Sequence, residues 1–292
     1  MKRKRVLVGL AVIVLILVFF FSLLLLIGRS GKSGGFAFSD RIAVIEIKGV
    51  ITQSAEIVAE INRYVDDEGI KAIILRVDSP GGGVGPSQEI YREVFKARAK
   101  KKVVTSMGSV AASGGYYIAS ASDVIFANPG TITGSIGVVM QFSSFEELLK
   151  KIGVKGMVIK SGEHKDIGSP FREMTPSERA LMQEVLDRVH QQFIQAVAEG
   201  RKMDPGKVAQ FATGRIFTGE QAKQYGLVDQ MGNLEDAIEA TAKLVGIEGR
   251  PSIVYPQRRI SIWDYLLQGM AQSLTKALSE KGFELSYRLS VP

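Results

Sequence analysis

The sequence predicts an α/β fold in which crossover helices connect a largely parallel sheet, preceded by one N-terminal transmembrane helix. From residue 41 onward, short runs rich in Val and Ile alternate with segments of helical periodicity. The runs are apolar enough to be strands buried on both faces, which is typical of parallel sheets. Ahead of them, residues 6–27 form an unbroken apolar run, which predicts a membrane span.

The N-terminal run is long enough to be an uncleaved anchor. A helix over residues 6–27 would reach about 33 Å at ~1.5 Å per residue, and the hydrocarbon core of a bilayer is about 30 Å thick. A cleaved signal peptide has a shorter apolar part and ends in a small-x-small site, and the stretch "LIGRSGKSGG" that follows the run here holds no convincing A-x-A. Basic residues are concentrated in residues 1–5, so the N-terminus is expected in the cytoplasm and the rest of the chain across the membrane.

The order of the remaining elements follows from periodicity. Strands are expected where β-branched residues run together, at residues 41–49, 71–79, 101–107, 124–130, 135–140 and 155–160. Helices are expected where apolar residues recur every three or four positions, at residues 54–69, 86–100, 113–123, 144–153, 175–201 and 233–246. Thr175 and Glu178 match a capping box, and Asn233 suits the start of the last of these helices.

Composition divides the chain into five parts. They are a basic N-terminus (1–5), the span (6–27), a Gly/Ser-rich linker (28–40), the folded domain (41–250) and an amphipathic tail (251–292). In the tail, apolar residues recur at helical spacing on one face: Trp263, Leu266, Leu267, Met270, Leu274, Ala277 and Leu278. Packing on the chain's own domain, a partner groove and the membrane surface all remain open for this face.

Charge and cysteine content exclude several functions. The formal charge is +7, but residues 1–40 hold six Lys/Arg and one Asp, which leaves only +2 for the other 252 residues. The basic excess therefore indicates targeting, and no nucleic acid is expected as a partner. The absence of cysteine excludes disulfides, thiolate metal sites and a cysteine nucleophile.

Histidine is scarce, which limits the choice of catalytic base. His190 is flanked by Arg188, Gln191 and Gln192, which favours a solvated helix face. His164 would have to serve a Ser-His-Asp triad alone, and no G-x-S-x-G motif is present. With no second histidine near the first, no metal site is expected, and no cofactor is expected either.

A serine activated by lysine is then the leading design for acyl transfer. The S-x-x-K at Ser273–Lys276 has no partner motif and is attributed to chance. Two other stretches are better candidates: "VDSPGGG" at 77–83 and "MGSVAASGGYYIAS" at 107–120. Taken alone, the first is either a tight turn or a source of backbone N–H groups aimed at a developing negative charge.

Together with "SGEHKDIGSPFREMT" at 161–175, these stretches resemble the signal peptide peptidase family, in its single-length form. The family consists of membrane-bound serine peptidases related in fold to Clp protease and the crotonases, so a spiral of β-β-α units is implied. The resemblance extends through "NPGTITGSIGVV" and "TGRIFTGEQAKQYGLVDQMGN" and covers about residues 42–247.

The resemblance also implies the roles of individual residues. Ser113 is the expected nucleophile and Lys165 the expected general base, while Gly82 and Gly114 are expected to supply the oxyanion N–H groups. Ser109 is expected to be a packing position on the same helix as Ser113. A lysine base must be neutral, so its pKa has to fall from ~10.4 to ~7–8, usually through burial.

The implied function is hydrolysis of cleaved signal peptides and other apolar peptides at a bacterial inner membrane, with the catalytic domain on its outer face. Double-length members of the family place lysine and serine in different halves. A single-length chain is therefore expected to complete its dyad between protomers of a ring. A crotonase-like acyl-CoA enzyme and a non-catalytic membrane scaffold are the alternatives.

Overall fold

An eight-stranded sheet organises the part of the chain that the computed structural model describes, residues 15–22 and 40–256. The strands are β1 Arg41–Lys48, β2 Ile70–Ser79, β3 Lys102–Ala112, β4 Val124–Ala127, β5 Ile132–Gly134, β6 Ile216–Thr218, β7 Gln230–Met231 and β8 Ser252–Val254. Their order is β6-β5-β3-β2-β1-β8, with β4 pairing with β3 and β7. The pairings are parallel except that of β5 with β6, so the expected α/β class with a largely parallel sheet is confirmed.

The helices connect these strands, and several of them pack on the sheet. They are α2 Ala55–Asp66, α3 Val84–Ala97, α4 Gly114–Ser120, α5 Glu146–Lys151, α6 Pro176–Arg201, α7 Pro205–Phe211, α8 Gly219–Gln224 and α9 Leu234–Leu244. The capping box of α6 is confirmed, because the N–H of Glu178 donates to Thr175 Oγ1 at 3.2 Å and the N–H of Thr175 donates to Glu178 Oε2 at 3.0 Å. Asn233 caps α9 through its side-chain oxygen.

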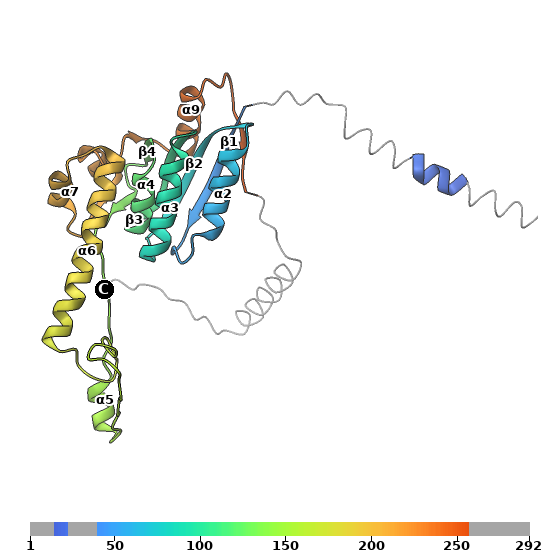
Figure 1. Cartoon of the computed structure of the whole chain (residues 1–292). Helices are drawn as coiled ribbons and strands as arrows, with labels where there is room; N and C mark the ends of the chain where they lie inside the picture. The colour runs from blue at the N-terminus through green and yellow to red at the C-terminus, as the bar shows by residue number, and fades with distance from the viewer. Residues whose placement is uncertain (1–14, 23–39, 257–292) are drawn as a thin grey trace, which may run out of the picture. The chain divides into compact units, whose positions relative to one another are not determined.

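The central strands are buried on both faces because alternate side chains enter two different hydrophobic clusters. In β1, Ile45 and Ile47 belong to the larger cluster, which also contains residues of α2, α3, α4 and α6. Ile42 and Val44 belong to the smaller cluster, which contains residues of α9. Figure 1 shows α2 and α3 side by side in front of the sheet. This two-sided burial explains why the strands are continuous apolar runs.

Two expected strands are absent from the structure. Residues 135–140 continue as irregular backbone because β5 ends at Gly134, where φ reaches +78°, and Ser135 follows with φ of +50°. Residues 155–160 are exposed and pair with no strand among the described residues. A β-branched sequence alone does not make a strand, because the backbone N–H and C=O groups also need a neighbouring strand.

The structure contradicts the expected location in a bacterial inner membrane with the N-terminus in the cytoplasm. Across residues 15–22 and 40–256, no helix combines the length and the apolar character that crossing a bilayer requires. Of the expected 6–27 span, only residues 15–22 are described, and they are helical. The rest of the expected 6–27 span, and the expected tail from residue 257 onward, lie outside the described residues.

Candidate active site

Ser113 is the single residue between the end of β3 and the start of α4. Its backbone adopts φ 51° and ψ −120°, which costs a residue with a Cβ of order 1–3 kcal/mol. The turn is held from both sides. The N–H of Ser113 donates to the Gly134 carbonyl at 2.9 Å, and the N–H of Tyr117 donates to the Ser113 carbonyl at 2.8 Å. A strained residue that is held this firmly is a candidate functional residue.

Ser109 was expected on the same helix as Ser113, but it lies on the strand β3, four residues before Ser113. Its side chain is exposed there. The side chain of Asp78, at the end of β2, accepts a hydrogen bond from the backbone of this part of β3. Asp78 Oδ1 accepts the N–H of Val110 at 3.0 Å, beside a register shift between the two strands. The two strand ends are thereby fixed relative to each other, just before the turns that follow them.

The glycine run after β2 packs directly against the Ser113 turn. A Cβ on Gly81 would lie 2.8 Å from both the Gly114 nitrogen and the Ser113 Cβ, and a Cβ on Gly82 would lie 2.1 Å from the Ile51 carbonyl oxygen. Side chains at these positions would push the backbones apart. Among the described residues, the N–H groups of Gly82 and Gly114 have no backbone or side-chain acceptor.

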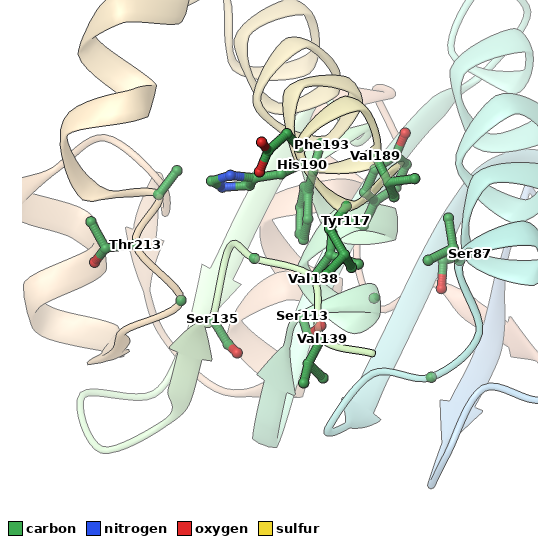
Figure 2. Close-up of a pocket in the computed structure, with 18 of the residues that line it drawn as sticks. Ser87, Ser113, Tyr117, Ser135, Val138, Val139, Val189, His190, Phe193 and Thr213 are labelled. Atoms are coloured by element: carbon green, nitrogen blue, oxygen red, sulfur yellow. The ribbon is translucent and has the colours of Figure 1, made fainter. Parts of the chain in front are cut away.

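Ser113, Gly82 and Gly114 line a cavity of about 530 Å³ (Figure 2). The opposite side is formed by α6, whose Phe193 ring packs on Tyr117 of α4 with centroids 4.8 Å apart. Burial raises the pKa of the Tyr117 hydroxyl, so this group stays neutral at physiological pH. The cavity therefore combines a serine hydroxyl, two free amides and a largely uncharged wall.

Lys165 lies outside this cavity. It is exposed in the irregular segment 161–168, and it is not among the residues that line the cavity. Its own N–H donates to the Gly162 carbonyl at 3.2 Å. The described chain therefore brings three of the four expected site residues together and leaves the lysine apart.

Lys165 belongs to a segment that we call the arm, residues 139–175, which leads from the β5 region to α6 and contains α5. One arginine ties the arm to the start of α6. Arg172 donates to both carboxylate oxygens of Asp166, at 2.8 and 2.9 Å, and to Glu178 at 2.8 and 2.5 Å. Lys160 also donates to Asp166, at 2.6 Å. The bonds from Arg172 hold the pKa of Asp166 well below its usual range and lower the pKa of Glu178 to about 2.

The arm also carries much of the exposed apolar surface of the described chain. Val139, Met157 and Ile159 are 87%, 89% and 94% exposed. Other exposed apolar residues of the arm are Met140, Phe142, Phe145, Leu148, Ile152, Val154, Val158 and Phe171. Apolar residues gathered on one segment in this way are typical of a surface that another molecule covers.

His190 lines the Ser113 cavity, which corrects the expectation of a solvated helix face. The expectation rested on its sequence neighbours, but on a helix the residues three and four positions away share a face. Leu186 and Phe193 stand at those positions, and both line the same cavity. That spacing was the signal in the sequence that could have placed His190 inward.

Comparison with known proteins gives a consistent result. Residues 96–248 match the profile of Peptidase family S49. The chain is 44% identical to slr0021, a candidate protease of Synechocystis sp., with 84% of this chain and 92% of that protein covered. It is 37% identical to a candidate signal peptide peptidase SppA of Enterococcus faecium, with 71% and 64% covered. It is 38% identical to Protease 4 of Salmonella typhi, with 73% of this chain but only 34% of that protein covered.

Proposed function

Because the chain belongs to the peptidase S49 family and is a serine peptidase similar to SppA and Protease 4, we propose that Ser113 is its nucleophile and Lys165 its general base. The observation that carries the proposal is the strained Ser113 turn on the wall of the cavity, beside two amides that have no acceptor within residues 15–22 and 40–256. Ser113 Oγ attacks the scissile carbonyl while Lys165 Nζ takes its proton. Lys165 Nζ then gives this proton to the amine product, which leaves, and water hydrolyses the acyl-enzyme.

The amides of Gly82 and Gly114 are the proposed oxyanion hole. Three features support this assignment: both residues line the cavity with Ser113, neither N–H has an acceptor among the described residues, and glycine lets the reacting carbonyl approach closely. Donors that are already oriented stabilise the tetrahedral intermediate without reorganisation, and one such donor typically contributes about 10²–10³ in rate.

Lys165 is a better candidate for the base than its neighbour Lys160. The Lys160 ammonium is bonded to the Asp166 carboxylate at 2.6 Å, and a carboxylate partner stabilises the charged form. Lys165 has no ion-pair partner among the described residues. A general base must lose its proton before it reacts, so the lysine without a carboxylate partner suits the role.

We propose that the dyad is completed between neighbouring copies of the chain in a ring. Lys165 is exposed and lies outside the cavity of its own chain, so a second surface has to supply the burial that a lysine base needs. The arm that carries Lys165 also carries the exposed apolar residues that such a contact would cover. Repeated head-to-tail contacts in a closed ring would give every copy the same composite site.

The proposed substrates are cleaved signal peptides and other apolar peptides, bound in extended form. Apolar side chains in the cavity wall support this, among them Val84, Val138 and Leu186. A fold of the Clp protease and crotonase type belongs to the same proposal. Membership of a peptidase family argues against both an acyl-CoA enzyme and a non-catalytic scaffold.

A fluorophosphonate label followed by peptide mapping tests the nucleophile. We expect the label on Ser113, because only an activated serine reacts with this reagent. Ser113→Ala should lose both labelling and peptide hydrolysis with its thermal unfolding midpoint nearly unchanged. Ser109→Ala is the matched control and should retain most of the rate. An inactive Ser109→Ala beside an active Ser113→Ala would show that the wrong serine has been assigned.

A further inference from the structure

A single carboxylate, that of Asp187, lines the Ser113 cavity within the described part of the chain, and the proposed reaction does not use it. Asp187 comes from α6, whereas Ser113 lies between β3 and α4. Figure 2 shows two further residues of this helix, His190 and Phe193, on a different wall of the cavity from Ser113. The carboxylate therefore borders the space that a substrate would occupy, on the helix that forms the side opposite the nucleophile.

Helical spacing turns Asp187 toward the cavity. Gln183 precedes it by four residues and His190 follows it by three, so the three residues share one face of α6, and all of them line the cavity. Gln183 Nε2 donates to Asp187 Oδ1 at 2.7 Å, while Asp187 Oδ2 has no donor within residues 15–22 and 40–256. The Asp187 side chain is exposed, so a group that enters the cavity from solvent can reach the second oxygen.

No lysine or arginine of the described chain neutralises Asp187. Its neighbour Arg188 pairs with Glu184 instead, at 2.7 Å. Neither a lysine nor an arginine is among the described residues that line the cavity, and apart from His190 the other lining residues are uncharged. The carboxylate therefore attracts a positively charged ligand group and repels a negatively charged one.

The surroundings of Asp187 suit the long side chain of a lysine or an arginine. Val84, Val138 and Leu186 give the cavity wall apolar surface, and a volume of about 530 Å³ is ample for an extended side chain. Basic side chains lay their aliphatic stem along apolar surface while the charged head stays with a polar partner. A bound peptide would also displace water around the carboxylate, which strengthens the attraction between opposite charges.

We propose that Asp187 is a specificity-determining residue whose carboxylate pairs with a lysine or arginine side chain of the substrate. The inference rests on the proposed peptidase function of the same cavity, to which it adds a preference for one positive charge beside apolar residues. Signal peptides combine both features, because a basic n-region precedes their apolar segment. The enzyme should therefore prefer a peptide with a positive charge at one position to its neutral analogue.

Arginine and citrulline are the pair that tests this preference, because citrulline has nearly the same shape and no charge. Each is placed in turn at every position around the scissile bond of an otherwise apolar peptide, and kcat/KM is measured for the full chain. We expect an Arg/citrulline ratio of about fivefold or more at one position, falling to about one in Asp187→Asn. At that position, Asp187→Lys should favour glutamate over glutamine.

Glu184→Gln is the matched control. Glu184 is an exposed carboxylate on the same helix, it pairs with Arg188, and it is not among the residues that line the cavity. Its loss changes the net charge as much as Asp187→Asn does, so it should leave the Arg/citrulline ratio unchanged. An unchanged ratio in folded Asp187→Asn would overturn the inference. An equal fall in kcat/KM for both peptides would overturn it too, because the carboxylate would then act on a group other than the substrate's charge.

A binding measurement separates this inference from the proposed function. Ser113→Ala protein, with and without Asp187→Asn, is titrated with fluorescent forms of the same peptide series, and Kd is measured by fluorescence anisotropy. Tighter binding of an arginine peptide that Asp187→Asn removes supports the inference. It does so even if the wild-type chain hydrolyses no peptide, a result that would contradict only the proposed peptidase function. Equal affinities for arginine and citrulline at every position, or no binding of any peptide, would overturn the inference.

Discussion

At the residue scale, close backbone packing explains why glycine is needed beside Ser113. A Cβ on Gly82 would lie 2.1 Å from the Ile51 carbonyl oxygen, which belongs to backbone and cannot turn aside. By contrast, a Cβ on Gly85, three residues later, would have no heavy atom within 4 Å. The two positions differ in packing although both lie in one glycine-rich stretch.

This contrast predicts opposite outcomes for two matched substitutions. Gly82→Ala should lower kcat by about 100-fold or more, because the shifted backbone misdirects one oxyanion donor. Gly85→Ala should retain full activity and unfold at the same or a higher temperature, because alanine is favoured over glycine in the helix α3. Steady-state kinetics and a thermal melt of both variants check this, and a wild-type kcat in Gly82→Ala would contradict the assigned role.

At the element scale, the arm is tied to α6 by charged groups rather than by a hydrophobic core. Glu178 caps α6 and also accepts from Arg172, which itself holds Asp166 next to Lys165. Arg172 therefore links the part of the arm next to the proposed base to the first turn of α6. Planar, bidentate geometry makes arginine more suitable than lysine at such a point.

The pH dependence of this attachment follows from the lowered pKa of Glu178. A carboxyl whose pKa falls to about 2 on folding contributes stability above its unfolded value, and the contribution is lost as the pH falls from about 4 to 2. Arg172→Gln should move the Glu178 midpoint back toward about 4.3, measured by carboxyl ¹³C NMR. Arg188→Gln removes an exposed pair with Glu184 on the same helix and should leave that midpoint in place. An unmoved midpoint in Arg172→Gln would show that Arg172 is not its cause.

At the scale of the whole molecule, the separation of Ser113 and Lys165 predicts complementation. Ser113→Ala and Lys165→Ala chains should each be inactive, yet their co-assembled mixture should recover part of the wild-type rate. In the mixture, some contacts pair an intact serine with an intact lysine. Peptide hydrolysis together with native mass spectrometry checks this. Inactive assemblies that contain both chains would mean that the dyad forms within one protomer.

The sequence by itself determined the features that depend on local pattern. Alternating buried strands and helices, the capping box at Thr175 and the glycine-rich turn after β2 follow from residue types that favour them locally. The ordered motifs around Ser113 indicated the peptidase family, which the comparisons confirm. The roles of Ser113, Lys165, Gly82 and Gly114 came from resemblance and remain predictions.

Only the tertiary structure decided the features that depend on distant partners. Residues 155–160 have the composition of a strand but no neighbouring strand in the described chain, and β5 ends where the backbone turns at Gly134. His190 faces the cavity because Phe193, three residues on, packs against Tyr117 of another helix. Lys165 lies outside that cavity because the arm leads away from it before α6 returns. Periodicity sets which residues share a face, but what covers that face is set by contacts between segments far apart in the chain.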